Sequence, residues 1–96
     1  MSFYTYIMAS GRNGTLYVGM TDDLPGRIWQ HKSKARPGSF TAKYGCDLLA
    51  WYEVHEERET ASRRERQIKE WRRPWKLRLI EEMNPDWADL NKTLNC

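Results

Sequence analysis

Residues 3–20 read FYTYIMASGRNGTLYVGM, and this stretch decides the fold of the chain. Residues 3–8 are aromatic and β-branched, which is typical of a strand, and residues 15–20 repeat that character. Between them stands Asn13-Gly14, a hairpin-turn signal, because both positions tolerate a positive φ. The chain therefore begins with a predicted β-hairpin.

The hairpin is expected to bring two tyrosines, Tyr6 and Tyr17, near each other on adjacent strands. Tyrosine is an ordinary strand residue that packs its ring and exposes its hydroxyl to water, and this is one interpretation of the pair. The other is that one phenol, made more acidic by a cation, activates water. Gly19 shares a face with Tyr17 and favours the second interpretation. A glycine inside a strand is tolerated best where a ligand or another backbone approaches closely, so Gly19 is a candidate substrate-binding residue.

The rest of the chain predicts one further strand and three helices. The strand covers residues 48–54, and the helices cover residues 24–34, 60–71 and 75–83. Residues 35–47 form a loop whose length favours a functional role. The order β-β-α-β-α-α predicts an α+β fold with a three-stranded, mainly antiparallel sheet flanked by helices.

With 96 residues the chain has room for one domain, with a core over residues 3–83 and a C-terminal tail over 84–96. Its two cysteines, Cys46 and Cys96, match no disulfide framework or metal-ligand spacing. There is no secretory signal pattern, and no apolar run approaches the roughly twenty residues of a membrane span. We therefore expect a reduced cytoplasmic protein without membrane contact. Its five tryptophans are many for so small a core, which leaves open an exposed interface with a protein partner.

The net charge is only +3, but the basic residues are concentrated in residues 32–43 and 58–78. Such clusters favour a polyanion partner, because each phosphate that they neutralise releases condensed counterions. The alternative is a solvated helix face, since glutamates are interleaved with the arginines. On the first interpretation, Lys32, Arg64 and Lys69 are expected to bind substrate phosphates.

Glu65 is an acid in an unusual place. It lies four residues after Ala61 and three before Ile68, on or beside the apolar face of the predicted helix. An unpaired ionised acid there would cost several kcal/mol. Three remedies stay open: an ion pair with one of the nearby arginines, a capping role that pairs it with Ser62, or a bound divalent cation. A site of one carboxylate, waters and substrate phosphate suits Mg²⁺.

Arg27 and His31 are four residues apart, so they share one face of the predicted helix over 24–34. A guanidinium can clamp a phosphate and stabilise the charge of a pentacoordinate transition state. An imidazole can donate to the same phosphate or help a phenol lose its proton. A surface arginine and a hydrogen-bonded histidine at the edge of the core are the alternatives.

Together these residues resemble the GIY-YIG nuclease superfamily, and in particular its small single-domain bacterial group. The resemblance rests on Thr5-Tyr6-Ile7, on the eleven-residue step to Tyr17-Val18-Gly19, and on the later Arg27, His31 and Glu65. It covers nearly the whole chain. It implies the β-β-α-β-α-α core and an endonuclease that hydrolyses phosphodiester bonds in DNA with a divalent metal ion.

The resemblance also assigns roles to the five residues. Tyr17 would be the general base, or the phenol that activates water, with Tyr6 hydrogen-bonded beside it. Arg27 would polarise the scissile phosphate, and His31 would assist. Glu65 would hold a single Mg²⁺ or Mn²⁺ that stabilises the leaving 3′ oxygen. Asn84 matches an asparagine found late in several members and is carried over as a substrate contact.

The chain also departs from the family pattern. Its first motif reads Thr5-Tyr6-Ile7 in place of Gly-Ile-Tyr, and Met20 stands where some relatives carry a lysine that could bind phosphate. No base-reading element is present, so selectivity for a DNA structure is expected rather than selectivity for a sequence. Two alternatives remain: a nucleic-acid-binding module with little turnover, and a subunit that needs a protein partner.

Overall fold

The computed structural model of the protein describes residues 2–33, 39 and 43–94. Most of the predicted loop over 35–47 lies outside these residues. The elements in chain order are β1 (Phe3–Ala9), β2 (Leu16–Thr21), α1 (Leu24–Ser33), β3 (Leu48–His55), α3 (Arg58–Glu70), α4 (Arg73–Met83) and α5 (Asn91–Leu94). The predicted α+β class and β-β-α-β-α-α order are confirmed, and the short α5 is an addition.

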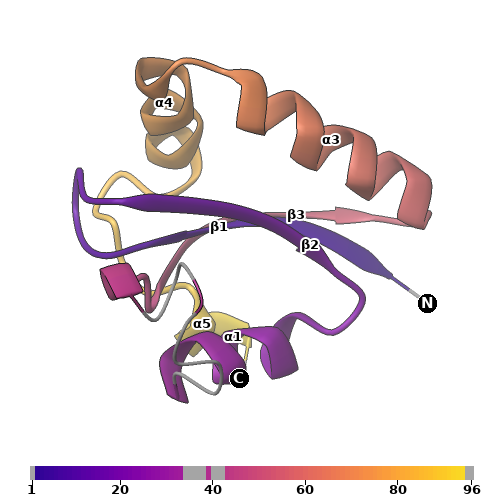
Figure 1. The fold of residues 1–96 in the computed structure, drawn as a ribbon, viewed down its shortest axis with the longest axis horizontal. Coiled ribbons are helices and arrows are strands. Elements are labelled where there is room, and N and C mark those ends of the chain that lie inside the picture. The colour runs from indigo at the N-terminus through magenta and orange to yellow at the C-terminus, as the bar shows by residue number, and fades with distance from the viewer. Residues whose placement is uncertain (1, 34–38, 40–42, 95–96) are drawn as a thin grey trace.

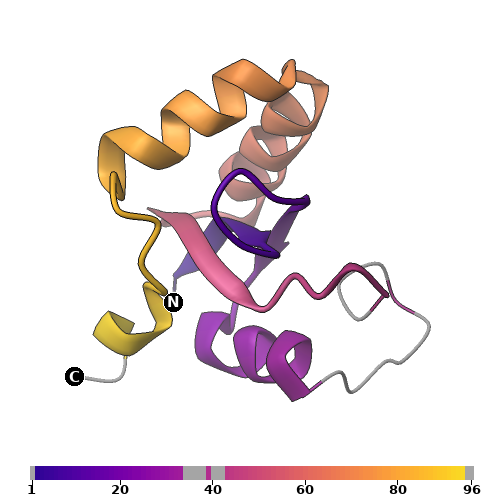
Figure 2. The ribbon, with the colours of Figure 1, turned by 90° about the vertical axis from the view of Figure 1, so that its left-hand side faces the viewer.

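The sheet is antiparallel throughout, with the strand order β2-β1-β3. Helices α3 and α4 cover one face, whereas α1 and α5 lie on the other (Figure 1). After α4 the chain passes along the side of the sheet to reach α5 beside α1 (Figure 2). Each face of the three strands is therefore covered by helices.

The two faces bury two separate apolar clusters, because successive side chains of the central strand point in opposite directions. Ile7 and Ala9 face α3 and α4, and Tyr6 and Met8 face α1. The helices meet these faces through the stripes that the sequence predicts, namely Leu24, Ile28 and His31 on α1, and Ala61 and Ile68 on α3. On α4, Ile80 is buried and Leu77 packs against the cluster, but Met83 is exposed; Trp87 supplies the buried side chain of this segment instead.

The hairpin connection contains the predicted Asn13-Gly14 turn signal. Strand pairing ends at Ala9 and Leu16, so residues 10–15 form the connection. Only Asn13 of the Asn-Gly pair has a positive φ, at 58°. The Gly14 N–H donates to the Gly11 carbonyl at 3.0 Å, so the tight turn lies within a wider loop.

Two helix starts lie earlier than the sequence predicts. Helix α3 begins at Arg58, so the start at Thr60 and the rival cap at Ser62 are both wrong. Helix α4 begins at Arg73, because Pro74 fits the first turn of a helix, where its missing N–H has no partner to lose.

Asn84 fastens the end of α4 to the sheet. It is buried, and its Nδ2 donates to the carbonyls of Ala50 at 3.1 Å and Ala88 at 2.8 Å. Its Oδ1 accepts the Ala88 N–H at 2.9 Å. These three hydrogen bonds go to the backbone and explain why the side chain is buried, whereas the substrate contact of Asn84 stays a prediction.

Lys32 and Asp89 tie α1 to the C-terminal segment. The Lys32 ammonium donates to the Asp89 carboxylate and, at 2.8 Å, to the Asp47 carbonyl. The same carboxylate accepts the backbone N–H groups of Leu49 at 3.2 Å and Asn91 at 3.1 Å. Lys32 was expected to bind a substrate phosphate, but its charge is already compensated by Asp89.

We predict that Asp89→Asn lowers the free energy of unfolding at pH 7 by about 1–2 kcal/mol, because it weakens charged hydrogen bonds in a partly exposed pair. Burial raises the pKa of Asp89, but the hydrogen bonds from Lys32, Asn91 and Leu49 outweigh it and leave the pKa lowered. The stabilisation is therefore complete above about pH 3.9, the ordinary aspartate pKa, and is lost as the pH falls through the lowered value.

Urea unfolding at pH 7 and at pH 2 measures both effects. The gap between the wild type and Asp89→Asn should close at the lower pH. Asp86→Asn, at an exposed position of the same segment, is the matched control and should have little effect at either pH. A gap of equal size at both pH values would contradict the role of the carboxylate charge.

Candidate active site

Tyr6 occupies the centre of the site. It lies on the central strand β1, is fully buried, and points toward α1. Its hydroxyl is 3.0 Å from Nε2 of His31. Burial, followed by the nearby Tyr17, raises the pKa of Tyr6 far above its ordinary value of about 10. Tyr6 therefore keeps its proton at neutral pH, and its hydroxyl is hydrogen-bonded to His31.

His31 is held as a neutral imidazole. It is buried on α1, and burial lowers its pKa to about 4, with a further contribution from the Arg27 guanidinium. At pH 7 the ring is therefore uncharged, and its tautomer sets which of the two groups donates the hydrogen bond between Nε2 and the Tyr6 hydroxyl. This bond fixes both rings and joins the central strand to α1.

Tyr17 completes a group of three rings. It lies on the edge strand β2 and is only partly buried. Its ring centroid is 6.3 Å from that of Tyr6 and 5.3 Å from that of His31. The prediction that the hairpin brings the two phenols together is confirmed, with Tyr17 as the more accessible of the two.

Gly19 makes room for Tyr6. It stands directly opposite Tyr6 in the strand register. A Cβ at this position would lie 2.6 Å from the Tyr6 hydroxyl oxygen, 2.7 Å from its Cζ and 3.0 Å from Cε2 of Tyr17. The predicted close approach is therefore real, but the approaching group is the Tyr6 ring, and substrate contact by Gly19 is not needed to explain the glycine.

Arg27 and Glu65 complete the predicted set of five. Arg27 is partly buried, one helical turn before His31, and its charge lowers the pKa of Tyr6 and of His31. Glu65 opposes Arg27 by raising the pKa of Tyr6. Both charges thus act on the same phenol, although α1 and α3 cover opposite faces of the sheet.

Glu65 is partly buried on α3, which packs against β1 and β2. Its carboxylate forms an ion pair with Lys69 at 3.6 Å, one turn further along α3. Of the three remedies expected for this acid, the observed one is an ion pair, but its partner is a lysine and not an arginine. Lys69 in turn lines a surface hollow that runs beside Tyr17, together with Leu16, Val18 and Lys76.

Arg64 of α3 and Lys76 of α4 lie at opposite edges of the sheet. Arg64, expected to bind phosphate, lies over β3, where it pairs with Glu53 at 3.2 Å and covers the rings of Trp51 and Trp71. Arg64 is not among the residues that line the hollow beside Tyr17. Lys76 does line this hollow. Nothing in the sequence distinguishes Lys76 from the other basic residues of the run, because only the packing of α4 brings it to β2.

The donor set around Glu65 suits a magnesium-like ion. Within the described ranges, no group of three or more histidine, cysteine, aspartate or glutamate side chains could hold a metal. A site built on the Glu65 carboxylate would thus rely on water and substrate phosphate for most of its ligands, as Mg²⁺ prefers. Cys46 is a free thiol buried in the apolar cluster on the α1 face of the sheet.

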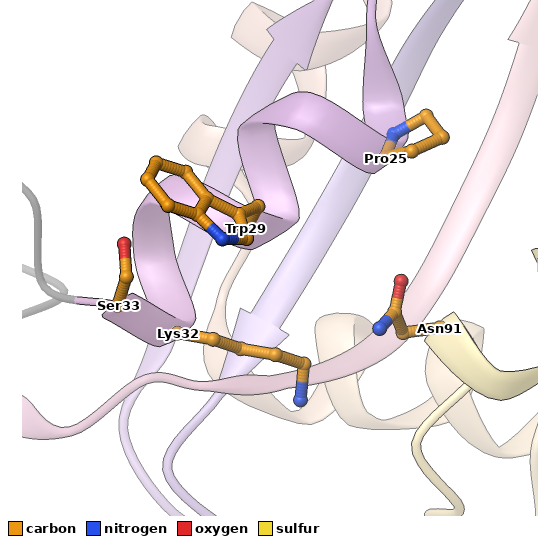
Figure 3. A pocket seen from close by; sticks show the side chains of 5 residues that line it. All are labelled: Pro25, Trp29, Lys32, Ser33 and Asn91. Carbon is orange, nitrogen blue, oxygen red and sulfur yellow. The ribbon is translucent and has the colours of Figure 1, made fainter.

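A second hollow lies on the outer side of α1 and is separate from the tyrosines. It is lined by Pro25, Trp29, Lys32 and Ser33 of the α1 segment and by Asn91 of α5 (Figure 3). Trp29 is 65% exposed there, and Trp75 on α4 is 63% exposed. The expectation that one or two tryptophans are exposed is confirmed.

The family described as "GIY-YIG catalytic domain" matches residues 2–78. The chain belongs to the GIY-YIG family. The match covers the hairpin, α1 and the whole of α3, and thus Tyr6 and the four other residues of the predicted set.

Its relatives are small bacterial proteins. A UPF0213 protein of Staphylococcus aureus is 32% identical over 81 residues, which are 84% of this chain and 96% of the relative. A UPF0213 protein of Desulfotalea psychrophila is 33% identical over 69 residues, or 72% of this chain, and the match spans 62% of that longer protein. The solution NMR structure of a UPF0213 protein from Bacillus halodurans aligns with a TM-score of 0.57 at 27% identity, covering 97% of this chain and 95% of that one.

None of the helices in the described part of this GIY-YIG chain is long and apolar enough to cross a membrane. The longest, α3, carries charged residues over most of its 13 positions.

We predict that Gly19→Ala lowers the free energy of unfolding by about 1–3 kcal/mol, because the added methyl group overlaps the Tyr6 phenol and forces a buried ring to move. Gly11→Ala is the matched control, since a Cβ there meets nothing within 4 Å. Thermal and urea unfolding of both variants measure the difference. Equal stability of the two variants would show that Tyr6 does not press against β2.

We predict that His31 titrates with a pKa of about 4 and that Arg27→Ala raises this value toward 6.5 without reaching it, because burial remains. Protonation of His31 then favours the unfolded state, so stability falls as the pH is lowered from about 6.5 toward 4. NMR titration of the imidazole shifts measures the pKa directly. Arg66→Ala, at an exposed arginine of α3, should leave it unchanged; an unchanged pKa in Arg27→Ala would place the guanidinium away from His31.

Proposed function

We propose that this protein is a divalent-metal-dependent endonuclease that hydrolyses phosphodiester bonds in DNA. The observation that carries the proposal is the convergence of Tyr17, His31, Arg27 and Glu65 on the single buried phenol of Tyr6. Membership of the GIY-YIG family supports a nuclease-type reaction. The steps below follow from the protonation states and charges of these residues.

Tyr17 is the proposed group that activates water. Tyr6 cannot act as a base at neutral pH, because burial raises its pKa and its hydroxyl keeps its proton. Tyr17 lies beside both rings on the edge strand and is the phenol that solvent can reach. A positioned general base contributes about 10²–10⁴-fold to a hydrolysis rate, which is the size of effect asked of Tyr17.

Arg27 is the proposed phosphate ligand. With Tyr6 protonated and His31 neutral, the α1 side of the site offers Arg27 as its positive charge. Within the described residues its guanidinium has no ion-pair partner, so its donors are available to a phosphate. Bidentate donation from a guanidinium favours the extra charge that develops on phosphorus-bound oxygens.

Glu65 is the proposed ligand of one Mg²⁺ or Mn²⁺ ion. When bound, such an ion supplies charge stabilisation for the leaving 3′ oxygen. The carboxylate is held on α3 by helix geometry, and its ion pair with Lys69 is weak enough to exchange, since half of the lysine side chain is exposed. A structural preference of the nuclease, rather than a sequence preference, is part of the proposal, because phosphate contacts carry no base information.

The test is cleavage of branched, flapped, nicked and plain duplex DNA with Mg²⁺ or Mn²⁺. We expect Tyr17→Phe and Glu65→Ala each to lower the cleavage rate at least about 10²-fold. Tyr52→Phe on β3 and Glu59→Ala at an exposed position of α3 are the matched controls and should keep wild-type rates. Absence of cleavage on every substrate, or full activity of Tyr17→Phe and Glu65→Ala, would refute the proposal.

The same assay separates the two alternative functions. DNA binding that is sensitive to salt, is unaffected by Glu65→Ala and is accompanied by no cleavage would identify a binding module. Cleavage that requires an added cell fraction would identify a subunit that depends on a partner, for which the exposed Trp29 beside the second hollow offers a contact surface.

A further inference from the structure

We infer that Lys76 on α4 binds a backbone phosphate of the substrate, next to the phosphate assigned to Arg27 and Tyr17. The inference rests on the proposed function of the site, and it adds to that function a contact that lies outside the five motif residues.

The first support is the position of Lys76. It lines the hollow beside β2 together with Leu16, Tyr17, Val18 and Lys69. The hollow thus has the ring of Tyr17 on one side and two ammonium-bearing side chains from α3 and α4 on the other. A strand whose scissile phosphate lies at Tyr17 has a neighbouring phosphate within reach of this hollow, because successive phosphates are separated by a single nucleotide.

The second support is the way in which α4 is held against the hairpin. The Arg73 guanidinium, at the first residue of α4, donates to the carbonyls of Asn13 and Gly14, both at 2.6 Å. Lys76 follows one turn later, so the same contact that fixes the helix start also fixes Lys76 beside the first residues of β2. Its placement is set by the fold and does not depend on a flexible loop.

The third support is charge. Lys69 is already paired with Glu65 at 3.6 Å. Among the residues that the structure describes, by contrast, no carboxylate lies within ion-pair distance of Lys76, and its side chain is partly buried against β2. Of the two ammonium groups at the hollow, that of Lys76 is therefore the one that is available to bind a phosphate of the substrate.

The experiment measures DNA affinity as a function of salt in EDTA, where the metal is removed and no strand is cut. For a phosphate contact, Lys76→Gln should lower the slope of log K against log salt by about 0.7–0.9, the release of one condensed counterion. Lys76→Arg keeps the charge and should keep the slope.

Arg78→Gln is the matched control. It removes one positive charge from the same helix, but Arg78 is exposed and borders a different hollow with Pro74, Leu77, Glu81 and Glu82. It should leave the slope unchanged. Thermal unfolding of each variant shows whether the fold is kept.

An unchanged slope in a folded Lys76→Gln protein, or an equal loss in Arg78→Gln, would overturn the inference even if the wild type cuts DNA. A reduced slope in Lys76→Gln alone would support it even if the wild type cuts nothing, in which case only the proposed nuclease activity fails.

Discussion

The site depends on one contact inside the hairpin, the packing of the Tyr6 ring against the bare backbone of Gly19. Because Gly19 has no side chain, the phenol can lie across the neighbouring strand and still reach His31 at 3.0 Å. That hydrogen bond orients α1 on the sheet, and α1 in turn carries Arg27. The positions of Tyr17, His31 and Arg27 thus all depend on the room that Gly19 of β2 leaves for the Tyr6 ring.

The site also lies at an edge of the three-stranded sheet and not in the middle of one of its faces. Helices α1 and α3 lie on opposite sides of a sheet that is only three strands wide, and β2 is one of its two edges. A residue of α3 on the β2 side, such as Glu65, can therefore contribute its charge to a phenol that faces α1. A wider sheet with β2 in its interior would keep the same residues apart.

The fold and the motif residues could be predicted because their signals are local or semi-local. Strand alternation in residues 3–20, the i, i+4 spacing of Arg27 and His31, and the apolar neighbours of Glu65 each follow from the period of one element. The contacts that the sequence did not predict depend on packing between distant elements. Lys32 and Arg64 look like available cations in the sequence. In the structure Asp89 compensates the charge of Lys32, and Glu53 compensates that of Arg64. Each acid is remote in the chain or on another element.

Asn84 matched a family position, yet its amide forms hydrogen bonds with the backbone of Ala50 and Ala88. Lys76 was missed for the opposite reason, because only the docking of α4 on the hairpin separates it from its basic neighbours.

The course of the chain after α4 makes the folded unit longer than the family motif. The family match ends at residue 78, within α4. Beyond it, Asn84 anchors the chain to β3, Trp87 enters the core under α4, and Asp89 holds α1 through Lys32. The C-terminal segment thus passes from one helical layer to the other and supports α1, the helix that carries Arg27 and His31. The contacts that brace α1 therefore continue beyond the residue at which the family match ends.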